Sequence, residues 1–454
     1  DCLQRPSNVL ERVQDRLDAV EELAFRTTER TKLQSMLKKV HDLERLVARV
    51  ALGRAGPRDL VALKQSISMI PHVRALLSNL QAPLICSQLG RLDDVTNIRE
   101  AIESTLTDDP PALLREGGFI RDGHDPNLDE LRAISRNAKQ LIAEMETAER
   151  ERTGIATLKV RYNRVFGYYI EISKSKLHAV PDDYHRKQTV ATGERFITPT
   201  LKEYEEKALG ADDRILETEQ TLFEALRQEV ATEASRIQDT AAALAWLDVL
   251  SALAETATLL NYTKPQVHDG DELNIIDGRH PVVERHCPDL FVPNDTLLNG
   301  SSQQLIILTG PNMGGKSTYL RQVALITFLA HIGSFVPAQQ AKIPIVDRVF
   351  ARVGASDNIA RGQSTFMLEM QETAKILHTA TSRSLVILDE IGRGTATFDG
   401  LSIAWAVAEH LATNSRVRPK TLFATHYHEL TDLGDSVPGV VNYHVVAREW
   451  QDDI

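Results

Sequence analysis

The feature that most constrains this fold is an apolar segment that leads into a phosphate-loop sequence. Residues 305–309 read Leu-Ile-Ile-Leu-Thr, and residues 310–317 match the pattern G-x-x-x-x-G-K-[ST]. Glycines at positions 310 and 315 let backbone N–H groups turn towards a phosphate, which also meets the positive end of the following helix. Lys316 is expected to reach the β- and γ-phosphates, and the Ser317 hydroxyl to bind Mg²⁺. The predicted nucleotide-binding residues of this loop are Gly310, Pro311, Asn312, Met313, Gly314, Gly315, Lys316, Ser317 and Thr318.

A second apolar segment supports this prediction, because it ends in two carboxylates. Residues 384–390 read Ser-Leu-Val-Ile-Leu-Asp-Glu, which is typical of a buried strand in a nucleotide-hydrolysing sheet. Asp389 is expected to bind Mg²⁺, directly or through water, and Glu390 to orient the attacking water as a general base. Taken alone, each motif has a plainer alternative: a glycine-rich turn that matches by chance, and a core strand capped by solvated acids. Their occurrence in one chain favours the catalytic interpretation, in which Lys316 also takes part.

Composition and charge indicate a soluble protein of several domains. The chain has 454 residues, of which 42% are hydrophobic and 25% charged. Its net charge of −11 opposes general attraction to a polyanion, so a nucleic-acid contact requires a local basic patch. Three isolated cysteines predict reduced thiols in the cytosol. No apolar run approaches the ~18 residues that span a bilayer, so no membrane association is expected.

Periodicity divides the chain into five segments. Helical spacing fills the first part, and the period changes to two after Thr153-Gly154. Pro199 marks the start of another helix, and strands alternate with helices from about residue 271. The expected segments are a helical core or lever (1–128), an ascending arm helix (129–155), a β-rich module (156–198), a descending arm helix (199–262) and an α/β domain (263–454).

The charge balance reverses in the β-rich module. Between positions 159 and 187, seven basic residues stand against three acidic ones, with tyrosines interleaved. Such a cluster can neutralise backbone phosphates of DNA without reading bases, although a solvated face is the plainer interpretation. A place at the tip of two long helices favours DNA contact, because a remote tip has little core to support. The candidate DNA-binding residues are Lys159, Arg161, Asn163, Arg164, Lys174, Lys176, Arg186 and Lys187.

Four further segments follow in an order that resembles the MutS family of DNA mismatch repair ATPases. They are Gly-Arg-His-Pro at 278–281, Ser-Thr-Phe-Met-Leu-Glu-Met at 364–370, Gly-Arg-Gly-Thr-Ala-Thr-Phe-Asp-Gly at 392–400 and Phe-Ala-Thr-His at 423–426. The module with Gly-Tyr-Tyr-Ile-Glu-Ile at 167–172, together with Tyr204-Glu205, resembles the clamp of this family. The resemblance covers nearly the whole chain. It implies a multidomain fold with an all-α core or lever, long helical arms, a small β-rich DNA clamp at their tip and a C-terminal α/β P-loop ATPase domain of the ABC type.

The resemblance also implies that each ATP lies between the phosphate loop of one subunit and a signature segment of the other. Ser364 resembles the signature serine that meets the partner's γ-phosphate, His426 the switch histidine that senses this phosphate, and Phe291 the aromatic that stacks on adenine. From the residues alone, Phe291 is equally consistent with core packing, His426 with an interior histidine, and Ser364 with a helix cap for which Thr365 competes. Ala396 departs from the family, whose members commonly carry serine there. The implied dimer-interface residues are Ser364, Thr365, Thr395, Thr397 and Asp399.

The leading hypothesis is a MutS-like, ATP-dependent mismatch repair protein. ATP binding and hydrolysis at the interface of a homodimer would control a clamp that holds mismatched or looped duplex DNA, with ATP and Mg²⁺ as cofactors. The resemblance further implies a MutL-type repair partner and a cytoplasmic, nucleoid-associated location. One alternative is a MutS homologue that clamps recombination intermediates without mismatch recognition, and another is a structural protein with an inactive ATPase. The aromatic-x-Glu wedge that contacts a mispair and the C-terminal dimerisation helices are expected outside residues 1–454, which would make this chain a fragment.

Overall fold

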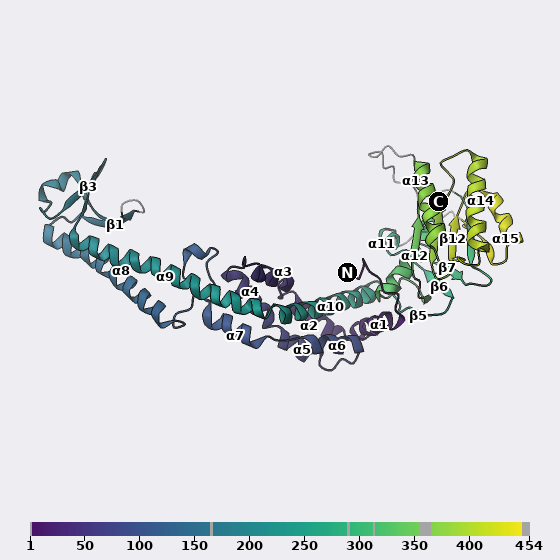
Figure 1. The fold of residues 1–454 in the computed structure, drawn as a ribbon, viewed down its shortest axis with the longest axis horizontal. Helices are drawn as coiled ribbons and strands as arrows, with labels where there is room; N and C mark the ends of the chain where they lie inside the picture. Colours follow the sequence, from purple (N-terminus) through teal and green to yellow (C-terminus); the bar gives the residue numbers. More distant parts are fainter. Residues whose placement is uncertain (1, 164–166, 288–290, 312–313, 354–364, 447–454) are drawn as a thin grey trace. The chain divides into compact units, whose positions relative to one another are not determined.

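The chain is rich in helix (Figure 1). It divides into two compact units. The structure is a computed structural model that describes residues 2–163, 167–287, 291–311, 314–353 and 365–446. The first unit comprises Asp1–Ser35, Leu76–Gly90 and Ala243–Ile454. The second unit comprises Met36–Ala75 and Arg91–Ala242.

The first unit contains a five-stranded sheet in which all strands are parallel. Three of its strands, β8, β11 and β12, are buried at every position, as expected when both faces of a parallel sheet are covered. Helices α12 (Lys316–Ile332), α13 (Thr365–Thr379) and α14 (Thr397–Thr413) alternate with these strands along the chain. The spatial order is β10 (Val349–Arg352), β11 (Leu385–Asp389), β12 (Lys420–Ala424), β8 (Leu305–Thr309) and β13 (Val440–His444).

A second, four-stranded sheet of the first unit packs beside α12. Its order is β5 (Gln266–His268), β9 (Gln340–Pro344), β6 (Leu273–Gly278) and β7 (Asn294–Leu298). The Thr296 hydroxyl of β7 donates to the Tyr319 hydroxyl of α12 at 2.8 Å, which fixes this sheet against the helix. The other helices wholly or mostly in this unit are α1 (Leu10–Phe25), α2 (Thr27–Leu37), α6 (Pro83–Arg91), α10 (Ala234–Leu259), α11 (Val283–His286), the 3₁₀ helix η4 (His428–Asp432) and α15 (Leu433–Ser436).

The second unit combines helices with an antiparallel sheet. The helices are α3 (Leu43–Ala51), α4 (Pro57–Ile67), α5 (Ile70–Leu77), α7 (Thr96–Thr105), the 3₁₀ helices η1 (Leu114–Glu116) and η2 (Lys174–Ala179), α8 (Pro126–Thr153) and α9 (Pro199–Thr232). The sheet order is β1 (Lys159–Asn163), β2 (Gly167–Ser173), β4 (Gly193–Ile197) and β3 (His185–Val190). One face of the sheet shares a hydrophobic core with α8 and α9, to which Ile142, Ile170, Ile172, Phe196 and Leu201 contribute.

Local sequence signals define the ends of α8 and α9. Asp125 caps α8 by accepting from the Leu128 N–H at 2.8 Å, and Thr198 caps α9 by accepting from the Leu201 N–H at 3.2 Å. A proline occupies the first helical position in both cases, where its missing N–H costs nothing. Gly154 ends α8 with φ of 68°, a conformation that favours glycine. Helix α9 therefore starts, and α8 stops, where the sequence predicts, whereas α8 starts at Pro126 and not at the expected residue 129.

The single descending helix expected over residues 199–262 is instead two helices. Helix α9 ends at Thr232. The N–H of the next residue, Glu233, bonds back to the Val230 carbonyl, and α10 starts at Ala234. Gly210, the expected weak point, lies inside α9. One exposed glycine costs a helix only about 1 kcal/mol, which packing along the rest of α9 can offset.

The sequence analysis expects no segment long and apolar enough to span a bilayer, but helix α10 is such a segment. By length and composition it is apolar enough to cross a membrane, with 39% of its apolar window buried. The search for an uninterrupted apolar run does not find this helix, because polar residues interrupt it. They leave its mean hydropathy as high as that of a membrane-spanning helix. A core helix of a globular protein meets the same criterion.

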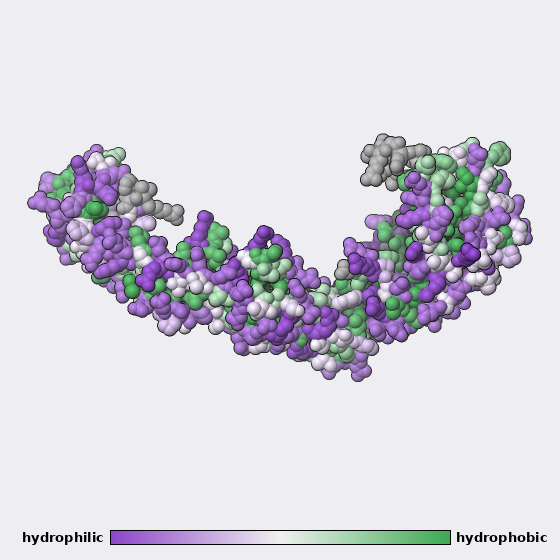
Figure 2. All heavy atoms as spheres, in the orientation of Figure 1, coloured by the Kyte–Doolittle hydropathy of each residue, from purple (hydrophilic) through white to green (hydrophobic). Residues whose placement is uncertain are grey.

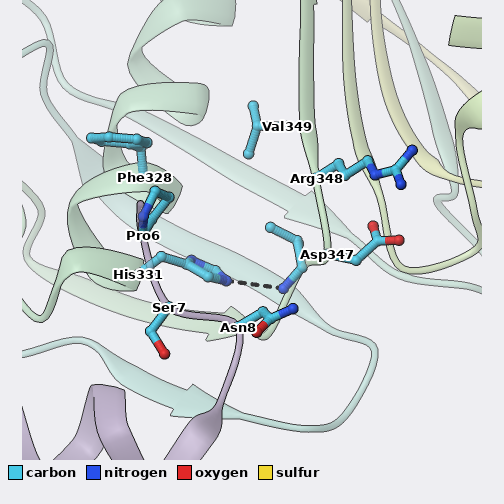
Figure 3. Close-up of a pocket in the computed structure, with 9 residues that line it drawn as sticks. Pro6, Ser7, Asn8, Phe328, His331, Asp347, Arg348 and Val349 are labelled. Atoms are coloured by element: carbon cyan, nitrogen blue, oxygen red, sulfur yellow. Dashed lines mark hydrogen bonds between the residues drawn. The ribbon is translucent and has the colours of Figure 1, made fainter. Parts of the chain in front are cut away.

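The C-terminal end of α12 is fixed by the buried side chain of His331 (Figure 3). Its Nε2 accepts from the Val346 N–H at 3.0 Å, so the ring proton is on Nδ1, which donates to the Thr327 carbonyl at 2.8 Å. The His331 carbonyl accepts from the Ser7 N–H at 3.1 Å. Burial lowers the pKa of His331, so the folded protein holds the ring neutral. A small cavity of about 170 Å³ adjoins it, between the N-terminal segment and α12.

We expect His331→Phe to destabilise the first unit by about 2 kcal/mol, because the Val346 N–H would be buried without an acceptor. In the wild type, stability should fall as the pH drops below about 6.5, because the unfolded histidine then binds a proton that the folded one does not. The variant should not show this part of the pH dependence. Urea unfolding at about pH 7.5 and about pH 5.5 tests this, with the exposed His428→Phe as control. An unchanged pH slope in His331→Phe would contradict it.

Candidate functional site

The predicted catalytic segments meet at one edge of the parallel sheet. Strands β8, β11 and β12 are neighbours through direct pairing of β11 with β12 and of β12 with β8. Because the strands are parallel, their carboxyl ends lie on the same edge. The residues that follow are the phosphate-loop sequence after β8, Glu390 after β11 and His426 after β12. The structure therefore brings together three segments that lie far apart in the sequence.

The phosphate-loop segment depends on two glycines with positive φ. Gly310 has φ of 141°, and a Cβ there would lie 2.9 Å from the Val445 carbonyl oxygen. Gly315 has φ of 88° and caps the start of α12. The Lys316 side chain is buried, and its Nζ donates to the carbonyls of Gly310 at 2.8 Å and Pro311 at 3.0 Å. The lysine therefore spans the loop through these two bonds. Asn312 and Met313 lie outside the described residues.

Asp389 is a buried carboxylate with spare bonding capacity. It is 7% exposed, and its Oδ1 has no hydrogen-bond partner among the described residues. Burial raises the pKa of Asp389, while a hydrogen bond from the Ser317 hydroxyl lowers it. A carboxylate in this position gains from a nearby cation. The described residues hold no cluster of three or more His, Cys, Asp or Glu side chains suited to a metal, so a cation here would need ligand oxygens as well.

Glu390 and His426 both reach solvent at this edge. Glu390 has φ of 55°, and its N–H donates to the Ala424 carbonyl at 2.9 Å. Its Oε2 accepts from Arg393 at 2.5 Å. His426 is exposed, with its ring 4.1 Å from that of Tyr427. The exposure of His426 rules out the interpretation as an interior histidine.

An open cleft of about 610 Å³ lies beside the phosphate-loop segment. Phe291 lines it and is half-buried, so the aromatic is not simple core packing. Gly314, Gly315 and Thr318 line the same cleft, which joins the loop to the aromatic side chain. Sequence reasoning missed several lining residues, because the fold brings them to the cleft from separate elements. They are Val283, Val292, Asn294, Asp295, Tyr319, Gln322 and Tyr443.

The predicted interface loop leads into α14 and is largely exposed. Thr397 and Asp399 are exposed, and Thr395 is half-buried. Phe398 between them is 83% exposed, which is unusual for a large apolar side chain. Ala396 occupies the cap position of α14 and makes no side-chain hydrogen bond, as its lack of a hydroxyl requires. Ser364 and the side chain of Thr365 lie outside the described residues.

The antiparallel sheet of the second unit presents basic side chains on the face opposite its core. Side chains alternate between the faces of a strand, so Lys159 and Arg161 lie opposite Val160, which packs on the core. Lys159 and Arg161 are exposed and form no ion pair with any residue that the structure describes. Figure 2 shows hydrophilic residues over most of the visible surface of this module.

Arg195 is a basic residue of the same face that sequence reasoning missed. Its guanidinium lies 4.4 Å from the ring of Tyr169, and its Nη1 donates to Gln188 at 2.8 Å. Glu171 lies 3.8 Å away. Only the pairing of β2 with β4 places Arg195 here, so alternation along one strand could not have found its neighbours.

The other candidate DNA-binding residues fall at several places in the module. Lys174 and Lys176 are exposed on η2, and Arg186 and Lys187 are exposed on β3. Arg186 lies 3.4 Å from Glu194, which offsets part of its charge. Asn163 ends β1 and is half-buried, whereas Arg164 lies outside the described residues.

Glu205 of α9 ties the β1–β2 hairpin to the helix. Its side chain is buried, and its Oε1 accepts from the Tyr168 N–H at 3.2 Å. Gly167 has φ of 76°, and a Cβ at this position would overlap Glu205 Oε1. Lys202 lies 3.2 Å from Glu205 Oε2 and partly balances its charge. Glycine is therefore required where the carboxylate passes beneath the hairpin.

Comparison with known proteins relates both units to one family. Residues 1–254 match the family model described as MutS domain III, and residues 306–454 match that of MutS domain V. The DNA mismatch repair protein MutS of Acetivibrio thermocellus is 52% identical over 453 residues, which cover 100% of this chain and 52% of the relative.

Two further relatives carry the same name. MutS of Solibacter usitatus is 52% identical over 455 residues, and MutS of Pelotomaculum thermopropionicum is 48% identical over 454 residues. In both cases the match covers 100% of this chain and 52% of the relative. The chain therefore spans about half the length of the curated relatives it matches.

We expect Glu205→Ala to loosen the β1–β2 hairpin, because the Tyr168 N–H would have no acceptor, at a cost of about 1–2 kcal/mol. Hydrogen exchange followed by mass spectrometry should show faster exchange in residues 167–173. Glu205→Gln keeps an acceptor oxygen and should change exchange much less. Glu206→Ala, an exposed neighbour, is the control for removal of charge from α9. Equal exchange in Glu205→Ala and the wild type would refute the tether.

Proposed function

This chain belongs to the MutS family of DNA mismatch repair proteins, and we propose that it binds and hydrolyses ATP to control a clamp on duplex DNA. The observation that carries the proposal is the buried carboxylate of Asp389, whose Oδ1 has no hydrogen-bond partner among the described residues. This is the arrangement that a Mg²⁺–ATP complex needs beside a phosphate-binding lysine. The names of the relatives favour mismatch repair over a role confined to recombination intermediates. The division into lever, arm helices, clamp and ABC-type ATPase domain is part of the proposal. Its segment bounds are those predicted from the sequence, except that the descending arm consists of the two helices α9 and α10.

ATP is proposed to occupy the phosphate-loop segment and the adjoining cleft. Lys316 would exchange its bonds to the loop carbonyls for bonds to β- and γ-phosphate oxygens. The adenine would stack on Phe291, which lines the cleft that also contains Gly314 and Thr318. Asn312 and Met313 belong to the same loop, and we propose from the sequence that they also contact the phosphates.

Hydrolysis is proposed to proceed by in-line attack of water on the γ-phosphate. Glu390 would orient this water after its carboxylate leaves the ion pair with Arg393. Mg²⁺, held by Asp389, Ser317 and phosphate oxygens, would neutralise charge on the phosphates. His426 extends from the same edge of the sheet and would sense the γ-phosphate and the water beside it.

A second copy of the chain is proposed to complete the site. Phe398, which stands between the exposed polar residues Thr397 and Asp399, is 83% exposed, and Met367 of α13 is 57% exposed. Such apolar groups gain from burial against a partner. We propose that Ser364 approaches the ATP held by the partner subunit. Thr365 and Thr395 are proposed to lie in the same dimer interface.

The antiparallel sheet of the second unit is proposed to contact the DNA backbone. The exposed face with Lys159 and Arg161 offers unpaired positive charge, and Lys174, Lys176 and Lys187 add to it. Base readout is not expected, because lysine and arginine on a sheet surface can follow phosphates of any sequence. The proposed DNA-contacting residues also include Asn163, Arg164 and Arg186.

Mismatch recognition, a MutL-type partner and a cytoplasmic, nucleoid-associated location are proposed for the whole protein. This chain spans about half of its curated relatives, so these properties rest on the family and on the names of the relatives.

We expect Glu390→Ala to lower ATP turnover by about 100-fold or more while ATP binding changes little, because the side chain acts on the water and not on the phosphates. Phosphate release and titration with a fluorescent ATP analogue measure the two quantities. Glu409→Ala removes an exposed carboxylate from α14 and should leave both unchanged. Unchanged turnover in Glu390→Ala would remove the assigned role.

Reversal of Lys159, Arg161 and Lys187 to Glu should weaken binding to matched and mismatched duplexes alike. The slope of log affinity against log salt should fall by about 0.9 for each phosphate that the protein no longer neutralises. Fluorescence anisotropy over a salt series measures both effects. Reversal of the exposed Lys32, Lys38 and Lys39 changes the net charge equally and serves as control. Weaker binding to mismatched DNA alone would contradict a backbone contact.

A further inference from the structure

Gln322 is a buried amide that faces the nucleotide cleft without a hydrogen-bond partner. It lies on α12, lines the cleft that Phe291 also lines, and is 0% exposed. Neither its Nε2 nor its Oε1 has a partner among the described residues. Thr327, on the same helix and equally buried, bonds to the Val323 carbonyl at 2.9 Å. Gln322 therefore lines the wall of the cleft with an amide that, unlike the Thr327 hydroxyl, has no partner among the described residues.

The surroundings of Gln322 leave room for its amide but do not bond it. A Cβ on Gly278 would lie 2.6 Å from Gln322 Nε2, so a larger residue at 278 would displace the side chain. The neighbouring polar groups are already engaged. Tyr319 Oη donates to the Asp295 carbonyl at 3.1 Å, and Asn294 Nδ2 donates to the Val292 carbonyl at 2.8 Å. A partner for Gln322 therefore has to enter the cleft.

An unpaired buried amide costs free energy unless a ligand supplies both a donor and an acceptor. The edge of adenine does this, because its amino group donates and an adjacent ring nitrogen accepts. A glutamine amide presents the matching oxygen and N–H₂ group. The edge of adenine is uncharged, so its recognition by Gln322 needs no charged side chain, whereas the phosphates at the other end of the cleft do.

We propose that Gln322 is a specificity-determining residue whose amide hydrogen-bonds the edge of the adenine that stacks on Phe291. This rests on the proposed function, since it assumes that ATP occupies the cleft. It adds a second interaction with the base, which fixes the rotation of the ring that stacking alone leaves free.

The test compares three ligands on the purified chain. ATP carries the whole base edge, purine riboside triphosphate lacks only the 6-amino group, and tripolyphosphate has no base. Competition against a fluorescent ATP analogue gives the affinity of each for the wild type, for Gln322→Met and for Gln322→Glu. Thr327→Val is the matched control on α12, because Thr327 is buried but does not line the cleft.

The wild type should prefer ATP to purine riboside triphosphate by about tenfold. Gln322→Met should reduce this preference to within about twofold, with tripolyphosphate binding unchanged, because only the hydrogen bonds to the base are removed. Gln322→Glu keeps one acceptor and should retain part of the preference. Thr327→Val should retain all of it.

Retention of the full preference in Gln322→Met would overturn the proposal, as would an equal fall in affinity for tripolyphosphate, which indicates a distorted loop. If Gln322→Met does not fold, as judged by thermal unfolding, Gln322→Leu, which also removes both polar groups of the amide, is measured in its place and judged by the same two outcomes. A wild type that binds neither ATP nor tripolyphosphate would refute the proposed function itself. A wild type that binds ATP without any dependence on Gln322 would refute only this inference.

Discussion

Helix α12 is fixed by buried hydrogen bonds at both ends, and the geometry of the candidate site depends on this. At its start, Lys316 bonds to two carbonyls of the phosphate-loop segment. At its end, His331 bonds to the Val346 N–H, and its carbonyl receives the Ser7 N–H. A helix of 17 residues is about 25 Å long and moves as a rigid body when its core contacts are intact. A displacement of the loop on ligand binding would therefore reach the N-terminal segment with little attenuation.

The overall charge of the chain and its local charges have different consequences. The net charge of −11 predicts weak non-specific attraction to DNA, and the acidic excess keeps most of the surface from holding a polyanion. The outer face of the antiparallel sheet is an exception, because Lys159 and Arg161 are exposed there without ion pairs among the described residues. Arg195 is different, since Tyr169 and Glu171 hold its guanidinium against the sheet. These charges are the reason why the proposed DNA contact is assigned to this face of the module.

Features that depend on short segments could be predicted from the sequence, and features that depend on tertiary pairing could not. The caps Asp125 and Thr198 and the glycines of the phosphate loop act through their own backbone, so their roles follow from their positions. The end of α9 at Thr232 carries no glycine or proline, which explains why a continuous helix was expected. Gln322 looked like an ordinary polar helix residue, because only the fold brings Gly278 and the cleft to its side chain.

The backbone conformation of Glu390 places the carboxylate that is proposed to orient water at the edge of the sheet. A non-glycine residue at φ of 55° is strained by about 1–3 kcal/mol and persists only where its surroundings fix it. Here the N–H of Glu390 bonds to the Ala424 carbonyl, which extends the pairing of β11 with β12 by one residue. The turn directs the carboxylate away from the sheet, towards Arg393, which is 67% exposed. An exposed ion pair contributes little, so the carboxylate can leave it for a water molecule at little cost in stability. The strain thus lies in the backbone, and the side chain can exchange Arg393 for the water molecule that it is proposed to orient.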